Sequence, residues 1–466
     1  PVIINSLGAY YFGIWQVLFQ LIAYLTAADL QPGTTLKWYV SKHKSVNDFD
    51  DISRKFSASI FVTIGSIPIY LLVAICISYF LPTITQSSEE DMSIISLTFY
   101  LLILTFIINQ FSFITKSLFV GMNLSYRRIG IQSVSTIAVG VLSYIFLIRD
   151  MGITGLGIAA VIGALLMLAL YYWLTRHVFY WLRLIKIKTS ELWEFISINS
   201  EYLLLKVSSL LSESFDLLLL AYFLGPAEVA SYSLTLFTAK GLRKFIQEFT
   251  TAYSPGLSIA RAESSSSFIS NRETFILINW LAIGMSFPIL IVINESFLSL
   301  WVGPDVYLGD LENLLIYLIV IFKLTRGLEV AVISMTLRVK EMASINIVVS
   351  VITILVSLVL VPKIGITGLL LPILGSVVFT NYAFYRMTNN VIEGYKSQFY
   401  NRGVVLAFFW IVTAFLMSWY WSFDMSWLRM IVYACTGSLF IFLSFWLTVF
   451  TRVQRSYILR MLSNNG

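Results

Sequence analysis

Long apolar runs separated by short polar connections dominate the chain. A membrane-spanning helix needs about 20 predominantly apolar residues, and thirteen segments approach or exceed that length. They are approximately 10–30, 56–81, 92–120, 129–148, 153–175, 193–224, 227–252, 274–301, 311–337, 343–361, 365–387, 403–421 and 427–450. The pattern predicts an all-α polytopic membrane protein whose connections are too short to fold as separate domains.

The segment 193–224 departs from a purely apolar pattern, because it carries ionisable side chains. At about 100° per residue, five of its polar side chains fall on one face of a helix. They are Asn199, Lys206, Ser209, Glu213 and Asp216. Ionisable groups at membrane depth are costly and persist mainly where they line a pathway or pair with one another. This face is therefore predicted to look into a polar cavity.

Two further predicted helices carry polar stripes. Helix 227–252 also carries Arg243, and its stripe consists of Ser233, Lys240, Lys244, Gln247 and Thr251. Helix 311–337 also carries Glu329, and its stripe consists of Lys323, Arg326 and Ser334. At a rise of 1.5 Å per residue, Lys240 and Lys323 fall about 18–20 Å below the outer surface, inside a hydrocarbon core of about 30 Å.

Each cation and acid on these stripes can form a neutral structural pair. Three neighbouring stripes with more cations than acids instead favour a hydrated cavity that binds an anion, with phosphate or diphosphate as the natural ligand. The candidate anion-binding residues are Lys206, Lys240, Arg243, Lys323 and Arg326. Glu213, Asp216 and Glu329 are candidate cavity or ion-coupling acids, and Ser209 and Gln247 are candidate polar lining.

The first half of the chain has a quieter polar face. Helix 92–120 places Thr105, Asn109, Ser112 and Lys116 on one side, and Asp29 lies near the inner end of helix 10–30. Uncharged groups such as Asn109 can meet sugar hydroxyls. Hydrogen bonds between helices, together with an interfacial aromatic belt, explain the same pattern and are favoured here.

The sequence contains an internal repeat. GITGL occurs at 152–156 and again at 365–369, an offset of 213, and LGAYYFGIWQV at 7–17 matches LGPAEVASYSL at 224–234 at an offset of 217. Pro32-Gly33 has a near counterpart in Pro255-Gly256, and both pairs are expected to interrupt the inner ends of equivalent helices. The repeat predicts two six-helix lobes in the same orientation, related by a pseudo-two-fold axis along the membrane normal.

The predicted division of the chain follows from this repeat. It gives an N-lobe at 1–178, a cytoplasmic linker at 179–192, a C-lobe at 193–390 and an additional helix pair at 391–466. On this numbering a first helix is expected to precede residue 1.

Composition supports a membrane protein and excludes several kinds of chemistry. Of the 466 residues, 58% are hydrophobic and 12% charged, far from the values of soluble domains. Both cysteines, Cys76 and Cys435, lie in apolar segments, and the two histidines, His43 and His177, lie in basic loops. Neither a disulfide framework, a metal site nor histidine-based catalysis is expected.

Charge placement predicts orientation. The net charge of +6 comes largely from Lys and Arg in alternate connections, which the positive-inside rule assigns to the cytoplasm. The opposite connections carry acids, including Glu89, Glu90 and Asp91. We therefore expect a multi-pass protein of the cytoplasmic membrane with basic loops inside and no nucleic-acid partner.

The opening of the sequence resembles a known family. Leu7-Gly8, Phe12-Gly13, Trp15, Asp29-Leu30 and Lys37 are similar to a signature of the bacterial polysaccharide and O-antigen flippases. The GITGL corners, the six-plus-six layout and the extra helix pair also resemble that family, within the multidrug/oligosaccharidyl-lipid/polysaccharide exporter superfamily. The resemblance covers nearly the whole chain and is weak for the substrate.

The resemblance implies a non-enzymatic flippase for surface polysaccharide biosynthesis. A polyprenyl-diphosphate-linked oligosaccharide would cross by alternating access through a cationic cavity. The bilayer and polysaccharide assembly proteins are implied partners, with no cofactor beyond H⁺ or Na⁺ as a coupling ion. One alternative is an ion-coupled multidrug antiporter of the same fold, which would need an acidic cavity. Another is a membrane-embedded polysaccharide polymerase or ligase, which would need a large outer loop bearing catalytic groups.

Overall fold

The computed structural model describes residues 2–27, 29–43, 48–187, 192–193, 196–197, 206–334, 338–389, 398–420, 425–450 and 455. These residues form helices and short connections, with no strand among them. The predicted residue Asn199 lies outside the described ranges.

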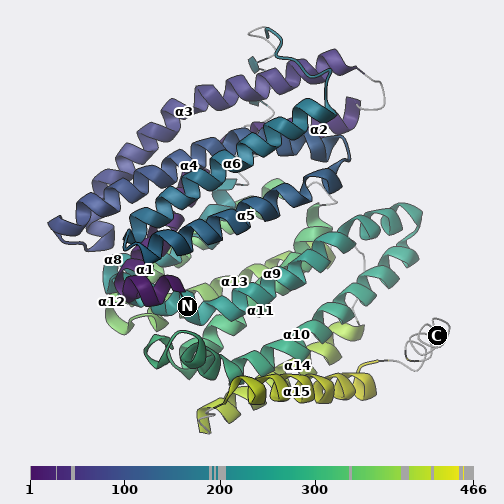
Figure 1. Ribbon diagram of the computed structural model, residues 1–466. Coiled ribbons are helices and arrows are strands. Elements are labelled where there is room, and N and C mark those ends of the chain that lie inside the picture. The colour runs from purple at the N-terminus through teal and green to yellow at the C-terminus, as the bar shows by residue number, and fades with distance from the viewer. Residues whose placement is uncertain are drawn as a thin grey trace. The chain divides into compact units, whose positions relative to one another are not determined.

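Most of the helices follow one another along the chain with short connections, and a longer stretch separates α6 from α8 (Figure 1). They are α1 (Val2–Leu25), α2 (Pro32–His43), α3 (Phe49–Thr85), α4 (Glu89–Gly121), α5 (Ser125–Ile148), α6 (Gly152–Val178), α8 (Asp216–Leu224), α9 (Pro226–Glu263), α10 (Ser265–Trp301), α11 (Asp310–Ser334), α12 (Val339–Ile364), α13 (Thr367–Asn389), α14 (Gln398–Tyr420) and α15 (Trp427–Thr448). A 3₁₀ turn, η2 (Pro304–Val306), lies between α10 and α11.

Ten of the described helices are long and apolar enough to cross a membrane, and the bent pair Lys206–Glu213 and Asp216–Leu224 would make eleven. Helices α9 and α11 have spanning length but carry the charged stripes identified above. The all-α polytopic class is therefore confirmed. Because α9 and α11 carry these charges, they are not among the ten helices that are apolar enough to cross a membrane.

The chain folds into two compact units, Pro1–Ala230 and Ser231–Gly466. This division differs from the predicted lobes, because α8 packs on α1 and α3 and so belongs to the first unit. The boundaries of the two six-helix lobes, which were inferred from the sequence repeat, stay a prediction.

The two repeat motifs adopt matching backbone conformations. Gly8 has φ 74° and ψ 169°, and its counterpart Gly225 has φ 92° and ψ 170°. In the two GITGL corners, Gly152 has φ 56° and Gly365 has φ 62°. L side chains rarely adopt positive φ, so the repeated glycines mark turns that both copies require.

Polar side chains cap the starts of several helices. Asp48 accepts a hydrogen bond from the backbone N–H of Asp51 at the start of α3, and Ser88 accepts one from Asp91 at the start of α4. Ser264 and Ser426 cap α10 and α15 in the same way. Such caps satisfy amide groups that have no partner within the helix.

The predicted helix 10–30 is wrong at its inner end. Helix α1 ends at Leu25, and α2 begins at Pro32 after a short non-helical break. Proline favours the first position of a helix, where its missing N–H costs nothing. Its repeat counterpart Pro255 does not interrupt α9, so the prediction that both Pro-Gly pairs interrupt equivalent helices is also wrong.

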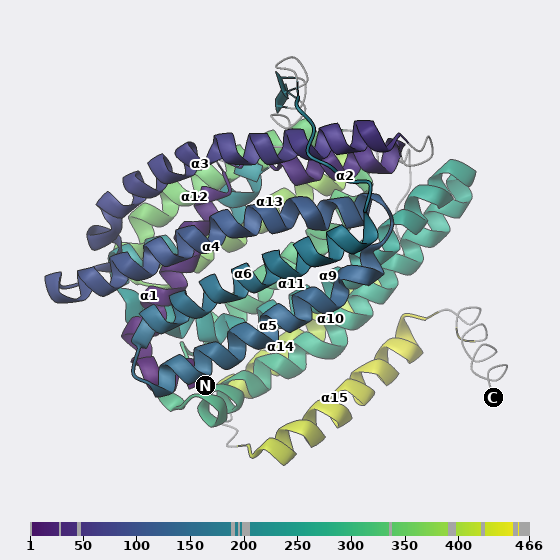
Figure 2. The ribbon, with the colours of Figure 1, turned by 45° about the horizontal axis from the view of Figure 1, so that its top comes forward.

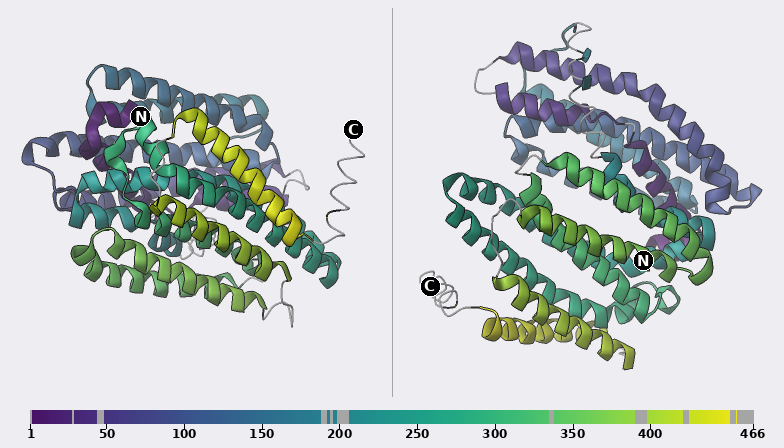
Figure 3. Two further views of the ribbon diagram at one scale, coloured as in Figure 1. Left: turned by 90° about the horizontal axis from the view of Figure 1, so that it is seen from below. Right: turned by 180° about the vertical axis from the view of Figure 1, so that it is seen from behind.

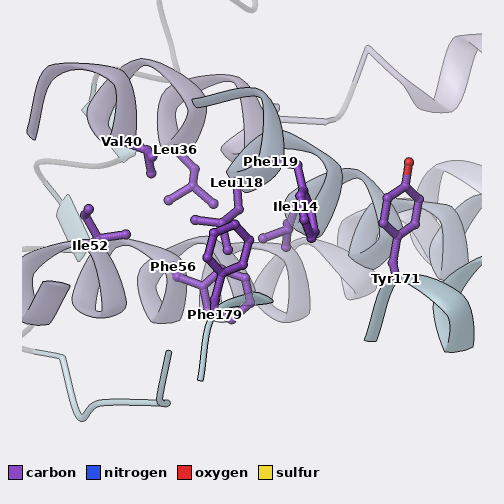
Figure 4. Packing of buried hydrophobic residues seen from close by; sticks show 9 residues of the cluster. All are labelled: Leu36, Val40, Ile52, Phe56, Ile114, Leu118, Phe119, Tyr171 and Phe179. Carbon is purple, nitrogen blue, oxygen red and sulfur yellow. The ribbon is translucent and has the colours of Figure 1, made fainter. Parts of the chain in front are cut away.

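The first unit has its apolar core where α2, α3, α4 and α6 meet. Leu36, Phe56, Ile114, Leu118 and Phe179 are buried together there, with four neighbours labelled in the close-up (Figure 4). Helices α4 and α6 lie side by side across the unit (Figure 2). The core fixes the helices whose polar faces are described below.

The second unit is organised around α10, which packs against α11, α14 and α15 (Figure 3). A buried polar network joins α9, α10 and α11. Asn294 donates to Asn313 Oδ1 at 2.8 Å and accepts from Thr238 at 2.7 Å, while Thr238 lies 2.7 Å from the Tyr317 hydroxyl. Buried polar groups satisfied in this way hold helices together in an apolar surrounding.

Candidate functional site

A polar cavity of about 370 Å³ lies inside the first unit. Its walls come from the break after α1, from α4, α5 and α6, and from the helical segment Lys206–Glu213. The lining residues are Thr26, Asp29, Gln31, Phe106, Asn109, Gln110, Ser112, Phe113, Lys116, Gln132, Met167, Tyr171 and Lys206. The cavity thus brings together two predicted site residues, Asn109 and Lys206, with Lys116 and Asp29 from the quieter face.

Two oxygens in this wall have unused hydrogen-bonding capacity. The Oδ1 of Asn109 and the Oγ of Ser112 are buried and have no hydrogen-bond partner in the described part of the chain. Ser112 itself is only 1% exposed. Leaving a buried polar group unpaired costs about 1–3 kcal/mol, so these atoms are available to a polar ligand or to water.

Two lysines contribute positive charge to the cavity. Lys116 on α4 and Lys206 both line it and are half-buried. Arg128 lies close enough to Lys116 and Tyr171 to act electrostatically on both. Cations so placed suit phosphate oxygens, which accept charge-assisted hydrogen bonds.

Asp29 is the acid of the cavity, and the protein holds it in place. Its Oδ1 accepts hydrogen bonds from the Gln31 backbone N–H at 2.9 Å and from the Tyr70 hydroxyl at 3.1 Å. The positive charge of Lys206 also acts on this carboxylate. Asp29 is 5% exposed, and these interactions offset part of the cost of burying its charge.

The stretch containing Lys206 is not one straight helix, which corrects the prediction of a continuous span over 193–224. Lys206–Glu213 and Asp216–Leu224 meet at an angle of 41°. At the break, the carbonyl oxygen of Ser214 accepts hydrogen bonds from Gln20 Nε2 at 2.6 Å and Tyr24 Oη at 2.9 Å. Helix α1 thereby stabilises the bend.

The bend changes what the predicted polar face can do. Lys206 lines the cavity, whereas Ser209 is exposed and Glu213 is half-buried. Asp216 begins α8 beyond the bend, where its Oδ1 accepts from the backbone N–H of Leu217 at 2.9 Å. The prediction treated residues 193–224 as one straight helix and so placed Asp216 on the same face as Lys206. The bend between them breaks that face, and this part of the prediction is wrong.

The remaining predicted cations lie in the second unit. On α9, Lys240 and Gln247 are exposed and Arg243 is half-buried. On α11, Lys323 and Arg326 are half-buried. These side chains do not line the cavity of the first unit, so their proposed role in anion binding is separate from it.

Glu329 has a buried partner that sequence reasoning missed. Arg272 Nη2 on α10 contacts both carboxylate oxygens of Glu329 at 3.1 Å, and both residues are 4% exposed. The pair joins α10 to α11. A carboxylate held in this way serves structure more readily than ion coupling, because removing either partner leaves an uncompensated buried charge.

Several cavity residues were also missed, although their signal is present in the sequence. Gln110 and Gln132 are amide side chains within the predicted helices 92–120 and 129–148, and Tyr171 lies in a third, 153–175. Uncharged polar residues within membrane-spanning helices also indicate which helix face lines a cavity, as charged residues do.

These features define the class of the protein, an all-α polytopic membrane protein with a cationic, polar cavity in a membrane-spanning unit. The family model described as "Polysaccharide biosynthesis protein" matches residues 1–258, more than half of the 466-residue chain. The chain belongs to the polysaccharide biosynthesis protein family. No curated protein matches the sequence.

Solved structures share the fold. A structure described as "Lipid II flippase MurJ, inward closed conformation" matches with a TM-score of 0.71 at 12% identity, covering 94% of each chain. An inward-facing multidrug resistance MATE family transporter of the MOP superfamily matches at 0.61 and 12% identity, covering 82% of this chain and 90% of that one. The MATE transporter VcmN of Vibrio cholerae, in its bent form, matches at 0.53 and 14% identity, covering 84% and 94%. The chain shares the fold of these transporters.

Proposed function

We propose that the protein is a flippase that moves a polyprenyl-diphosphate-linked oligosaccharide across the cytoplasmic membrane for surface polysaccharide synthesis. The observation that carries this proposal is the cavity of the first unit, in a chain that belongs to a polysaccharide biosynthesis family. The similarity in fold to a lipid II flippase supports it.

The chemistry of the cavity suits such a headgroup. Lys116 and Lys206 offer ammonium donors to diphosphate oxygens, and Asn109 and Ser112 offer unpaired oxygens to sugar hydroxyls. Aromatic rings of Phe106 and Phe113 in the same wall provide flat apolar surface for the less polar faces of a sugar. Transport requires this site to open in turn to each side of the membrane.

A lipid-linked anion fits the cavity better than the cationic drug of a multidrug antiporter. Asp29 is the only carboxylate among the lining residues that the structure describes, and Tyr70 and Gln31 already hydrogen-bond to it. Two lysines share the space. A drug cation would have to bind against this excess of positive charge.

The proposal includes a coupling ion, H⁺ or Na⁺, with Glu213 and Asp216 as candidate ligands. It also includes the orientation in which the basic connections face the cytoplasm. Assembly proteins that extend or export the glycan are the natural partners, because they receive the product on the outer face.

Deletion of the gene in its own host tests the proposal. Lipid-linked oligosaccharide should accumulate, surface polysaccharide should fall, and the accumulated glycan should resist a glycosidase added to intact spheroplasts but be cleaved after lysis. Unchanged surface polysaccharide together with higher retention of cationic dyes would instead support a multidrug antiporter. Accumulated oligosaccharide that the added glycosidase cleaves in intact spheroplasts would support a polymerase or ligase.

A further inference from the structure

A second, apolar groove lies in the first unit and shares no lining residue with the polar cavity, although α4 and α6 contribute to both. Its volume is about 430 Å³, within the range of about 300–1,000 Å³ of small-molecule pockets. Its lining comes from the first half of α3, the second halves of α4 and α6, and the segment that follows α6. Phe56, Ile60, Phe111, Ile114 and Leu168 form its apolar walls.

Part of the groove lining is packed into the apolar core of the unit. Phe56, Ile114 and Phe179 belong to the buried core of the unit (Figure 4). A ligand in the groove would therefore contact a preformed apolar surface and would not have to order it.

The segment after α6 closes one side of the groove and is fastened to α3. The backbone N–H of Ile185 donates to Ser57 Oγ at 2.9 Å, and Arg183 forms an ion pair with Asp50 at 2.8 Å. The rings of Phe49 and Trp181 lie 4.5 Å apart. These contacts hold the segment as a strap across the ends of α3 and α6.

The mouth of the groove is cationic. Arg176 is exposed, lies over the ring of Tyr172 at 5.4 Å and donates to its hydroxyl at 3.2 Å. Arg183 also lines the mouth, and Asp50 neutralises part of its charge. Arg176 has no acidic partner among the described ion pairs, so the mouth keeps a net positive charge.

A polar atom beside this mouth lacks a partner. Thr175 is 7% exposed and lines the groove, and its Oγ1 has no hydrogen-bond partner among the described residues. Its place next to Arg176 puts an unused hydroxyl donor where an apolar wall meets a cation. Basic pockets between membrane-spanning helices bind anionic lipid headgroups.

We infer that this groove binds an anionic glycerophospholipid of the surrounding bilayer. One acyl chain would lie between α3, α4 and α6, the Thr175 hydroxyl would donate to an ester or phosphate oxygen, and Arg176 would bind the phosphate. The groove lies at the helix ends that the basic connections assign to the cytoplasm, where anionic lipids meet basic pockets between helices. The strap fixes the walls, which suits a resident lipid more than a transported one.

Native mass spectrometry of the delipidated full chain tests this inference. The probes are phosphatidylglycerol and phosphatidylcholine with identical acyl chains. The wild-type protein should prefer phosphatidylglycerol, and Arg176→Gln should weaken that preference about fivefold. Leu168→Trp, which fills the groove, should weaken binding of both lipids. Arg149→Gln, a change of another exposed arginine in the same unit, should leave both unchanged.

Two results would overturn the inference. One is an equal loss of phosphatidylglycerol binding in Arg149→Gln and Arg176→Gln, which would indicate nonspecific charge attraction. The other is displacement of phosphatidylglycerol by polyprenyl phosphate at lower concentration, which would assign the groove to the lipid of the transported substrate. Size-exclusion profiles that match wild type establish that each variant is folded.

Discussion

The hydroxyl of Tyr24 donates a 2.9 Å hydrogen bond to the carbonyl oxygen of Ser214, 190 residues away in the sequence. With the donor from Gln20, this contact satisfies a carbonyl that the bend between Lys206–Glu213 and α8 leaves without its helical partner. Lys206 lies on the segment that precedes this bend and lines the polar cavity. Helix α1 therefore contacts the bent pair that carries a cavity residue.

Replacing Tyr24 with Phe and Gln20 with Leu together should lower both stability and transport. Each lost hydrogen bond is worth about 0.5–1.5 kcal/mol, and the orphaned Ser214 carbonyl adds a desolvation cost. Thermal unfolding in detergent should show a lower midpoint, and export of glycan should fall further than the protein level. Tyr79→Phe is the matched control, because Tyr79 is 80% exposed. An unchanged midpoint in the double variant would show that the bend does not depend on α1.

The buried pair between Arg272 and Glu329 should behave as a structural unit. Arg272→Met or Glu329→Gln alone should destabilise the protein by about 3–5 kcal/mol, since each leaves the other charge or dipole without its partner. Arg272→Met combined with Glu329→Leu should recover much of that loss.

Unfolding midpoints of the three variants measure this coupling. Arg338→Met with Glu341→Leu provides a control at an exposed pair, whose removal should change stability by less than about 1 kcal/mol. If Glu329→Gln kept full stability and lost transport, Glu329 would be a functional acid, as the sequence first indicated.

The repeated glycines should resist substitution equally. Gly8→Ala and Gly225→Ala force an alanine into a region of backbone space used almost only by glycine, which costs about 1–3 kcal/mol each. A Cβ meets nothing closer than 3.6 Å at either site, so the cost is conformational and not steric. Gly130→Ala, within α5 with open space around it, should instead be neutral or slightly stabilising.

Unfolding midpoints measured for the three alanine variants decide this point. Equal losses at Gly8 and Gly225 would support the two-fold repeat as a structural symmetry. A loss at only one of them would show that the repeated motif has lost its role in the other copy.

The sequence predicts the all-α membrane fold, the internal repeat and several polar residues of the cavity, since all three depend on patterns of nearby residues. Apolar runs locate the membrane-spanning helices. The turns at LG and GITGL contain a glycine with positive φ in both copies, and these two short sequences therefore occur twice in the chain. Asn109 and Lys206 were recognised from helical projection alone, and both line the cavity.

The bend and the ion pair could not be predicted in this way. The sequence around Ser214 contains neither glycine nor proline to indicate a break. The break is stabilised by hydrogen-bond donors on α1, which are distant in the sequence. The partner of Glu329 lies 57 positions away on another helix, and spacing along one helix carries no information about it. Long-range contacts of this kind follow from packing.

The most direct test of the account is surface polysaccharide in cells that carry Lys206→Ala or Lys116→Ala. Each variant should reach the membrane at normal levels and lose most export, by about tenfold or more, because a charge-assisted contact to a buried phosphate is worth about 1.5–3 kcal/mol. Lys363→Ala, at an exposed lysine of the second unit, should export normally. Lys240→Ala and Lys323→Ala, measured in the same cells, test whether the second unit adds to anion binding. Normal surface polysaccharide in both Lys116→Ala and Lys206→Ala would contradict the assignment of this cavity to the lipid-linked headgroup.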